Sequence, residues 1–202
     1  MTENIKNFNA VIVGVGGQGQ ITLLKILAQA ALSENWDVKT SELHGLSQKG
    51  GQVEVHFRLG KGFFSPLVEE GSADLIIALE RQEALRACYY GSKEAKTAFL
   101  VNDLSLPIPN QKPFTEEEIK KNLKKFSEKI IFVPATDICQ KEFDAGIGAG
   151  VYLISLAVFK NLLPLKPASI KKAIKKIVKP KYVNLNLKIF ELAREKSKET
   201  GF

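Results

Sequence analysis

The sequence has only two cysteines, Cys88 and Cys139, and no Cys-x-x-Cys pair. Two thiolates are too few for a four-cysteine iron–sulfur cluster, and they cannot close a zinc site without other ligands. We therefore expect this chain to hold no metal and to carry no catalytic metal centre of its own. In any redox chemistry in which it takes part, the electrons would travel through something other than such a centre.

Long apolar runs are also missing. No stretch approaches the roughly 18–20 consecutive apolar residues that a membrane-spanning helix needs. The first six residues, Met1 to Lys6, lack the basic-then-apolar order of a secretory signal peptide. We expect a cytoplasmic protein that does not associate with membranes.

Strand and helix patterns alternate along most of the 202 residues. Short apolar runs typical of strands are expected at 8–13, 37–43, 52–59, 74–79, 97–101 and 130–133. Helical spacing of apolar residues is expected at 20–35, 81–90, 150–161, 167–178 and 184–198, and Thr115 with Glu118 matches a capping box. This order predicts an α/β fold: one Rossmann-like domain over residues 1–202, with a mostly parallel sheet and a helical C-terminal part from about 160 to 202.

The run 52–59 has the clearest alternation of these strands. Apolar residues at 53, 55, 57 and 59 alternate with Glu54, His56 and Arg58. Such a period of two predicts a strand with one buried face.

A glycine-rich loop follows the first expected strand and precedes the first expected helix. It consists of Gly14, Val15, Gly16, Gly17, Gln18 and Gly19, which satisfies G-x-G-x-x-G. The open N–H groups of a helix start favour an anion, so the loop is a candidate anion or nucleotide site. Glu42, near the end of the next strand, stands where a ribose-binding acid is expected. Close packing of strand, turn and helix explains the glycines equally well, and both interpretations stay open.

A second unusual loop joins the expected strands 37–43 and 52–59. Its polar side chains are His44, Ser47, Gln48 and Lys49, and its glycines are Gly45, Gly50 and Gly51. Glycines permit positive φ or a close approach of the backbone to another surface. The polar side chains suit contact with a ligand or a neighbouring protein, although a solvated turn is the alternative.

These segments, taken in order, resemble the gamma domain of the pyruvate/2-oxoacid:ferredoxin oxidoreductases. The resemblance runs through the glycine loop 14–19, the segment 41–51, the strand ending in His56-Phe-Arg-Leu-Gly60, the segment Gly71–Glu80 and the strand ending at Asn102. It is strong over about residues 8–110 and weak beyond. As a free-standing chain with a basic tail, the protein is most similar to the small (beta) subunits of the indolepyruvate-type enzymes.

The resemblance implies an accessory, non-catalytic subunit of a complex that oxidatively decarboxylates a 2-oxoacid, such as an aryl pyruvate, with coenzyme A as co-substrate. The products are acyl-CoA, carbon dioxide and reduced ferredoxin. Thiamine diphosphate, Mg²⁺ and the iron–sulfur clusters would belong to a large partner subunit. The loop from His44 to Gly51 would then lie at the interface with that subunit and help to shape the thiamine site.

Two departures from the family pattern stand out. The segment Asp144–Gly150 replaces an expected Gly-Asn stretch, which puts the substrate-side contacts of that region in doubt. Lys49 stands where arginine is common, so the charge is kept but the bidentate guanidinium is lost.

The net charge of +7 is unevenly distributed. From Lys160 onward there are 12 Lys and Arg against 3 Asp and Glu, a net of +9, whereas residues 1–159 carry 17 against 19, a net of −2. Lys171, Lys175 and Lys179 form one stripe of an amphipathic helix, which is either solvated or docks on an acidic partner such as ferredoxin or the large subunit. We expect no nucleic-acid partner, because no recognised binding module accompanies the lysines.

Two other functions remain alternatives at this stage. One is a stand-alone nucleotide-binding Rossmann protein, such as an NAD-dependent sensor or reductase, which the glycine loop favours. The other is a basic interaction module, which the charged tail favours.

Overall fold

A computed structural model describes residues 7–45, 50–107 and 112–199 of the chain. A six-stranded sheet runs through its centre in the order β2-β3-β1-β4-β5-β6. The strands are β1 (Phe8–Val15), β2 (Val38–His44), β3 (Gln52–Leu59), β4 (Leu75–Ala78), β5 (Ala98–Asn102) and β6 (Lys129–Val133). β3 pairs antiparallel with both β1 and β2, while β1, β4, β5 and β6 pair in parallel. Only β3 is therefore reversed, and the prediction of a mostly parallel α/β sheet is confirmed.

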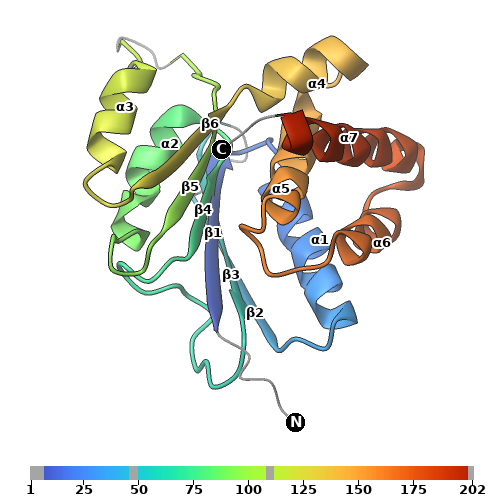
Figure 1. Ribbon diagram of the computed structural model, residues 1–202, viewed down its shortest axis with the longest axis horizontal. Coiled ribbons are helices and arrows are strands. Elements are labelled where there is room, and N and C mark those ends of the chain that lie inside the picture. Colours follow the sequence, from blue (N-terminus) through green and yellow to red (C-terminus); the bar gives the residue numbers. More distant parts are fainter. Residues whose placement is uncertain (1–6, 46–49, 108–111, 200–202) are drawn as a thin grey trace.

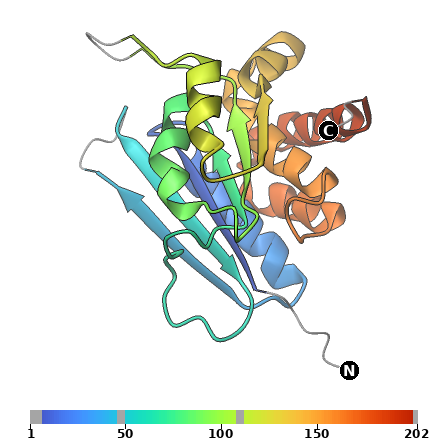
Figure 2. The ribbon, with the colours of Figure 1, turned by 60° about the vertical axis from the view of Figure 1, so that its left-hand side comes forward.

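Helices cover both faces of the sheet (Figure 1). On one face lie α1 (Gln20–Ser33), α5 (Ala149–Phe159), α6 (Pro167–Ile177) and α7 (Pro180–Glu199). On the other lie α2 (Arg81–Arg86), the 3₁₀ turn η1 (Ala87–Tyr90) and α3 (Glu116–Leu123), which Figure 2 brings forward. α4 (Ala135–Phe143) and the 3₁₀ turn η2 (Gly146–Gly148) lie beyond the end of β6. Each face has its own buried apolar cluster, which suits a two-sided α/β core.

α5 is the central helix of the larger layer. Its residues Ala149–Val158 are all buried, because the helix packs against β5 on one side and against α1, α6 and α7 on others. A helix that is apolar all round belongs in a core, and here its packing explains why the C-terminal part forms one body with the sheet. Among the described residues, none of the helices combines the length and the hydropathy needed to cross a bilayer.

Most expected elements form within a few residues of the predicted bounds, and the capping box of Thr115 and Glu118 is present. Two differences concern the helices. α4 was not expected, because nine residues between a strand and a glycine-rich turn carry little periodic signal. α7 begins at Pro180 rather than at 184, since proline is well suited to the first turn of a helix.

The prediction that β3 buries only one face is wrong. Glu54, His56 and Arg58 are all buried as well as the apolar residues between them. The segment 60–71, which returns from β3 to β4, covers this second face, and Arg58 donates hydrogen bonds to two of its carbonyls, those of Ser65 (3.0 Å) and Leu67 (2.8 Å). Alternation in the sequence could not reveal this cover, because the segment has no regular structure of its own.

A polar network fills the space beneath that segment. The Val68 amide donates to His56 Nδ1 (3.0 Å), so the neutral imidazole carries its proton on Nε2, which donates to Glu54 Oε1 (2.9 Å). The Tyr90 hydroxyl donates to the same Glu54 oxygen (2.6 Å). Burial raises the pKa of the Glu54 carboxyl, but the hydrogen bonds from His56 and Tyr90 and the electrostatic interaction with the imidazole together outweigh it, so this pKa lies below its ordinary value of 4.5.

We expect the Glu54 carboxylate to give the fold an acid-sensitive stability. A carboxyl whose pKa is lowered by folding stabilises the native state above its unfolded-state pKa, and this contribution is lost as the pH falls through the folded-state pKa. The free energy of unfolding of the wild type should therefore decline below pH 4.5 more steeply than that of Glu54→Gln. Urea unfolding at a series of pH values measures the free energy of unfolding of both proteins. If the free energy of unfolding falls with pH equally in the two proteins, the Glu54 network is not the source of the acid sensitivity.

Candidate functional site

The candidate site lies at the edge of the sheet where the five co-directional strands end. Crevices outside the carboxyl ends of parallel strands are the usual ligand positions in open α/β sheets. β1 ends there in the glycine loop, and β2 ends there in the loop that starts at His44. Because β3 is reversed, it begins at the same edge, so the second loop starts and finishes there.

The structure brings the two loops singled out in the sequence into contact. The Gly16 amide donates to the Gly51 carbonyl (2.7 Å), and the Gly50 amide lies 3.5 Å from the Gly16 carbonyl. His44 and Gly45 are exposed at the same edge. Ser47, Gln48 and Lys49 lie outside the described residues. The backbone of the glycine loop therefore holds the end of the second loop in place.

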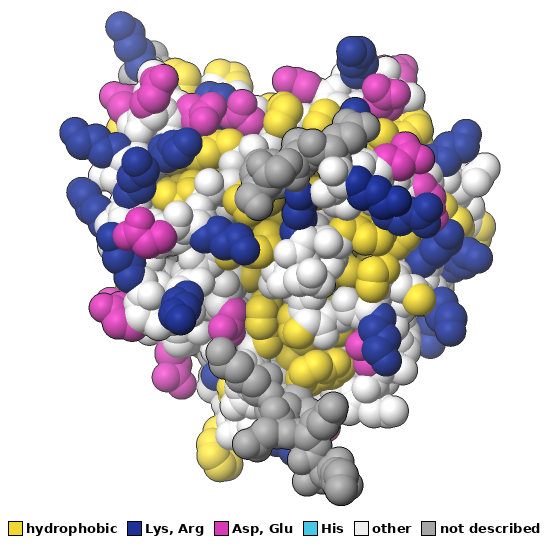
Figure 3. Space-filling view, in the orientation of Figure 1, with side chains coloured by type: hydrophobic (Ala, Val, Ile, Leu, Met, Phe, Trp, Pro, Cys, Tyr) yellow, Lys and Arg dark blue, Asp and Glu magenta, His cyan; other side chains and the backbone are white. Residues whose placement is uncertain are grey.

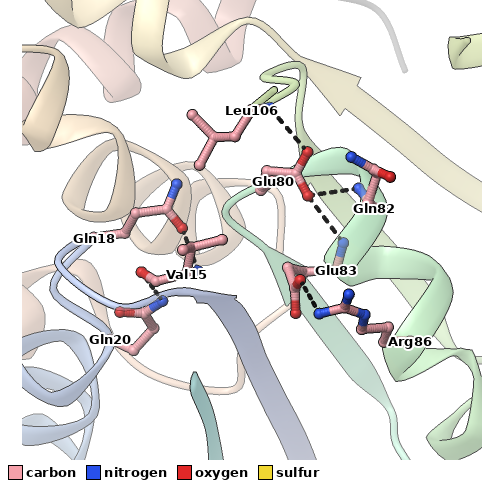
Figure 4. A network of polar contacts seen from close by, with 8 residues as sticks. All are labelled: Val15, Gln18, Gln20, Glu80, Gln82, Glu83, Arg86 and Leu106. Carbon is pink, nitrogen blue, oxygen red and sulfur yellow. Dashed lines mark hydrogen bonds and ion pairs between the residues drawn. The ribbon is translucent and has the colours of Figure 1, made fainter. Parts of the chain in front are cut away.

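Two glutamines satisfy the polar groups inside the glycine loop (Figure 4). Gln18 Oε1 accepts from the Val15 amide (2.8 Å), and Gln18 Nε2 donates to the Leu79 carbonyl at the end of β4 (3.3 Å). The Gln20 side chain is buried and donates to the Val15 carbonyl (3.0 Å). These bonds join the end of β1 to the start of α1 and to β4.

The glycines of the loop have different roles. A Cβ at Gly14 would lie 2.5 Å from both Gln18 Oε1 and Gln20 Nε2, so close packing alone explains this glycine. Gly17 (φ +104°) and Gly19 (φ +87°) adopt left-handed conformations that disfavour other residues, and nothing crowds either of them. No side chain caps α1, because Gly19 occupies the N-cap position. The backbone amides in the first turn of α1 lie at this edge of the sheet, as an anion-binding site would require.

Glu42 is not where a dinucleotide-binding acid would be needed. In the dinucleotide fold that acid ends the strand next to β1, but here β3 lies between β1 and β2. Glu42 is therefore two strands away from β1, roughly 10 Å at the usual strand spacing, and its side chain is exposed. This topology removes the main support for the NAD-dependent alternative.

Two polar residues that the sequence marked only as part of the family resemblance, with no role assigned, organise the same edge. Glu80 caps α2: its Oε2 accepts from the amides of Gln82 (2.7 Å) and Glu83 (3.1 Å), and its Oε1 accepts from the Leu106 amide (3.2 Å). Asn102 at the end of β5 donates to the Leu79 carbonyl (3.0 Å) and accepts from the Thr136 amide (3.2 Å). A polar residue directly after an apolar strand was the available signal for both.

Glu83 lies beside this cap in the first turn of α2 (Figure 4). Its Oε1 accepts from Arg86 (2.7 Å), while its Oε2 is buried and has no hydrogen-bond partner among the described residues. Burial raises the pKa of this carboxyl, the nearby Glu80 and Glu54 raise it further, and Arg86 opposes them. The edge thus keeps one carboxyl that takes up a proton more readily than an exposed one.

Two clefts open at this edge. One of about 740 Å³ lies between the start of α1, the turn η2 and the junction of α6 and α7, and Gln18, Lys25, Ile147, Lys179 and Tyr182 are among its lining residues. A smaller one of about 180 Å³ lies above β4 and β5. The segment that departs from the family pattern, Asp144–Gly150, contributes to both clefts, so its substitutions change their walls.

The cysteines do not join the site or each other. Cys139 is buried in the apolar cluster on the α1 face, and Cys88 packs against the cluster on the α2 face. Over the described residues, no group of three or more His, Cys, Asp or Glu is placed to hold a metal ion.

The variant Gly14→Ala tests the packing of the glycine loop. The new Cβ should displace the Gln18 and Gln20 amides and lower the free energy of unfolding by about 1–3 kcal/mol, the usual cost of overpacking. Chemical denaturation of the isolated chain measures it. The same substitution in a Gln18→Ala/Gln20→Ala background should cost clearly less. An equal cost in both backgrounds would show that the glutamines are not the obstacle.

Comparison with known proteins places these features in a family. The family model of pyruvate ferredoxin/flavodoxin oxidoreductase matches residues 9–196. The chain is 35% identical to the indolepyruvate oxidoreductase subunit IorB of Archaeoglobus fulgidus, covering 91% of this chain and 92% of the relative. It is also 35% identical to IorB of Pyrococcus horikoshii, covering 96% and 98%.

Solved structures agree on the fold. The pyruvate oxidoreductase subunit PORC of Thermotoga maritima superposes with a TM-score of 0.72 at 21% identity, over 94% of this chain and 96% of that one. The 2-oxoglutarate:ferredoxin oxidoreductase of Magnetococcus marinus superposes with a TM-score of 0.70 at 16% identity, over 97% of this chain but only 32% of the longer one. The resemblance seen in the sequence is confirmed. The chain belongs to the pyruvate ferredoxin/flavodoxin oxidoreductase family.

Proposed function

We propose that this chain is the small accessory subunit of a 2-oxoacid:ferredoxin oxidoreductase that acts on aryl pyruvates such as indolepyruvate. The observation that carries the proposal is the match to IorB subunits over nearly the whole length of both chains. The complex would convert a 2-oxoacid and coenzyme A to acyl-CoA and carbon dioxide, and two electrons would pass to ferredoxin.

The cofactors of this reaction would belong to the large subunit. The residues of this chain do not fit an iron–sulfur cluster, because its two cysteines lie in the apolar clusters on opposite faces of the sheet. Thiamine diphosphate with Mg²⁺ would supply the decarboxylation chemistry on the partner. The contribution of this chain would be to bind that subunit and to complete the walls of its site.

We place the contact with the large subunit at the carboxyl edge of the sheet. The loop from His44 to Gly51 begins with exposed residues, and its last two residues are hydrogen-bonded to the glycine loop. Glycines at both ends permit close approach of another backbone, and the adjacent α1 start would favour an anionic group. His44, Ser47, Gln48 and Lys49 would contact the partner beside the thiamine site, with the glycine loop as the candidate position for an anionic part of a substrate.

The isolated chain should contain no iron or thiamine and should fail to reduce viologen dyes with any 2-oxoacid and coenzyme A. Purification of the tagged chain from its native cell should bring down a brown, iron-containing large subunit, and that complex should reduce the dye with indolepyruvate. Metal analysis, mass spectrometry and dye reduction measure these outcomes. Turnover by the pure, metal-free chain would overturn the accessory assignment.

Substitution of His44, Gln48 or Lys49 by alanine should leave the stability of the isolated chain unchanged but impair the complex. The melting temperature of the isolated chain should hardly change, since exposed loop substitutions usually cost within about 0.5 kcal/mol. In the complex, the same changes should weaken assembly or lower turnover about tenfold, equivalent to about 1.4 kcal/mol. Lys61→Ala and Glu94→Ala, in loops at the opposite edge, are the matched controls. If all three loop variants assemble and turn over like these controls, the loop is only a solvated turn.

A further inference from the structure

The outer face of α6 carries a dense group of lysines. Three of them are exposed on the helix, and two more follow at the α6–α7 junction: Lys172, Lys175, Lys176, Lys179 and Lys181. Ile170, Ala173 and Ile174 on the inner face of α6 are buried. The orientation of the helix is therefore fixed, and these lysines remain on its outer face. Figure 3 shows Lys and Arg side chains gathered on the side of the molecule where Figure 1 places α6 and α7. We call these five residues the lysine face.

Two carboxylates that contact α6 or its N-cap are already engaged. Glu191 of α7 pairs with Lys171 (2.5 Å) and with Arg194 (3.1 Å), and Glu34 accepts from the Lys166 amide (2.8 Å). Within the described part of the chain, no carboxylate forms an ion pair with any lysine of the face. Surfaces of soluble proteins usually mix the two signs, so a patch of one sign points to attraction of a partner of the opposite sign.

The lysine face continues into the larger cleft at the carboxyl edge. Lys179 lines that cleft together with Lys25 from α1. The positive surface therefore reaches from the outer side of α6 to the edge at which we place the large subunit. A partner on the lysine face would lie next to that subunit rather than on a remote part of the complex.

The amino-acid composition of the lysine face favours a partner that binds transiently over one that binds permanently. The cores of permanent interfaces are rich in large apolar residues and poor in lysine. The exposed positions of α6 hold Pro167, Ala168 and lysines but no large apolar side chain. Charge attraction without apolar burial speeds encounter and permits rapid release. In a complex of this family, the macromolecule that has to arrive and leave in every turnover is the electron carrier.

We propose that the lysine face docks the acidic surface of the electron-carrier protein that receives electrons from the complex. The proposal rests on the proposed function, because it needs the large subunit to supply the electrons. This chain would hold the carrier by charge while the electrons pass between the partner's clusters and the carrier.

The test uses the purified complex with Lys172→Glu, Lys175→Glu and Lys176→Glu combined. Turnover is followed with ferredoxin from the same cells and, separately, with a viologen dye. The KM for ferredoxin should rise about tenfold or more at low salt, a typical size for lost electrostatic steering. In the wild type this KM should rise with salt, whereas in the variant it should respond weakly or in the opposite sense. Dye reduction and assembly should be unchanged.

The matched control is Lys120→Glu, Lys121→Glu and Lys124→Glu on α3. It makes the same change in net charge on the opposite face, where Glu116, Glu117 and Glu118 already mix the signs. Its KM for ferredoxin should stay within about twofold to threefold of the wild type. Equal effects of the two triple variants, or no effect of either, would overturn the docking proposal. Loss of assembly in the α6 variant alone would assign the face to the large subunit and overturn it too. A wild-type chain that purifies without an iron-containing partner would instead refute the proposed function.

Discussion

The arrangement at the carboxyl edge depends on the absence of a side chain at Gly14. Because no Cβ is present there, Gln18 and Gln20 can fold back onto the end of β1 and bind both polar groups of Val15. The hydrogen bonds of these two glutamines to Val15 fix the glycine loop. The loop in turn holds the Gly50–Gly51 backbone through Gly16. This packing links the end of the second loop and the start of α1 to both clefts, because Gln18 also lines each of them.

The reversed strand β3 decides what kind of site this edge can be. By lying between β1 and β2, it separates the glycine loop from the strand end that would carry a ribose-binding acid in a dinucleotide fold. In its place it brings a glycine-rich loop to the α1 start. A fingerprint that suggests NAD in the sequence therefore belongs to a different geometry. The proposed contact with the large subunit would take the place of the second half of a nucleotide site.

Much of the fold was predictable because local patterns and tertiary packing agree. The βα alternation, the Thr115 capping box and the apolar stripe of α6 are all present as expected. The buried Glu54, His56 and Arg58 were not predictable, because their cover is an irregular segment whose position is set by tertiary hydrogen bonds. Both loops of the candidate site were singled out in the sequence by their glycines, and the structure joins them through Gly16, Gly50 and Gly51. The roles of Glu80 and Asn102 were missed because a single polar residue at the end of a strand does not reveal which backbone groups it binds.

The central claim is that the carboxyl edge faces a large catalytic subunit while the lysine face stays open. Hydrogen–deuterium exchange, compared between the isolated chain and the purified complex, tests it most directly. The account predicts slower amide exchange in the complex over residues 16–20 and 44–51, with α6 unchanged. Unchanged exchange at the two loops, or protection confined to α6, would contradict it.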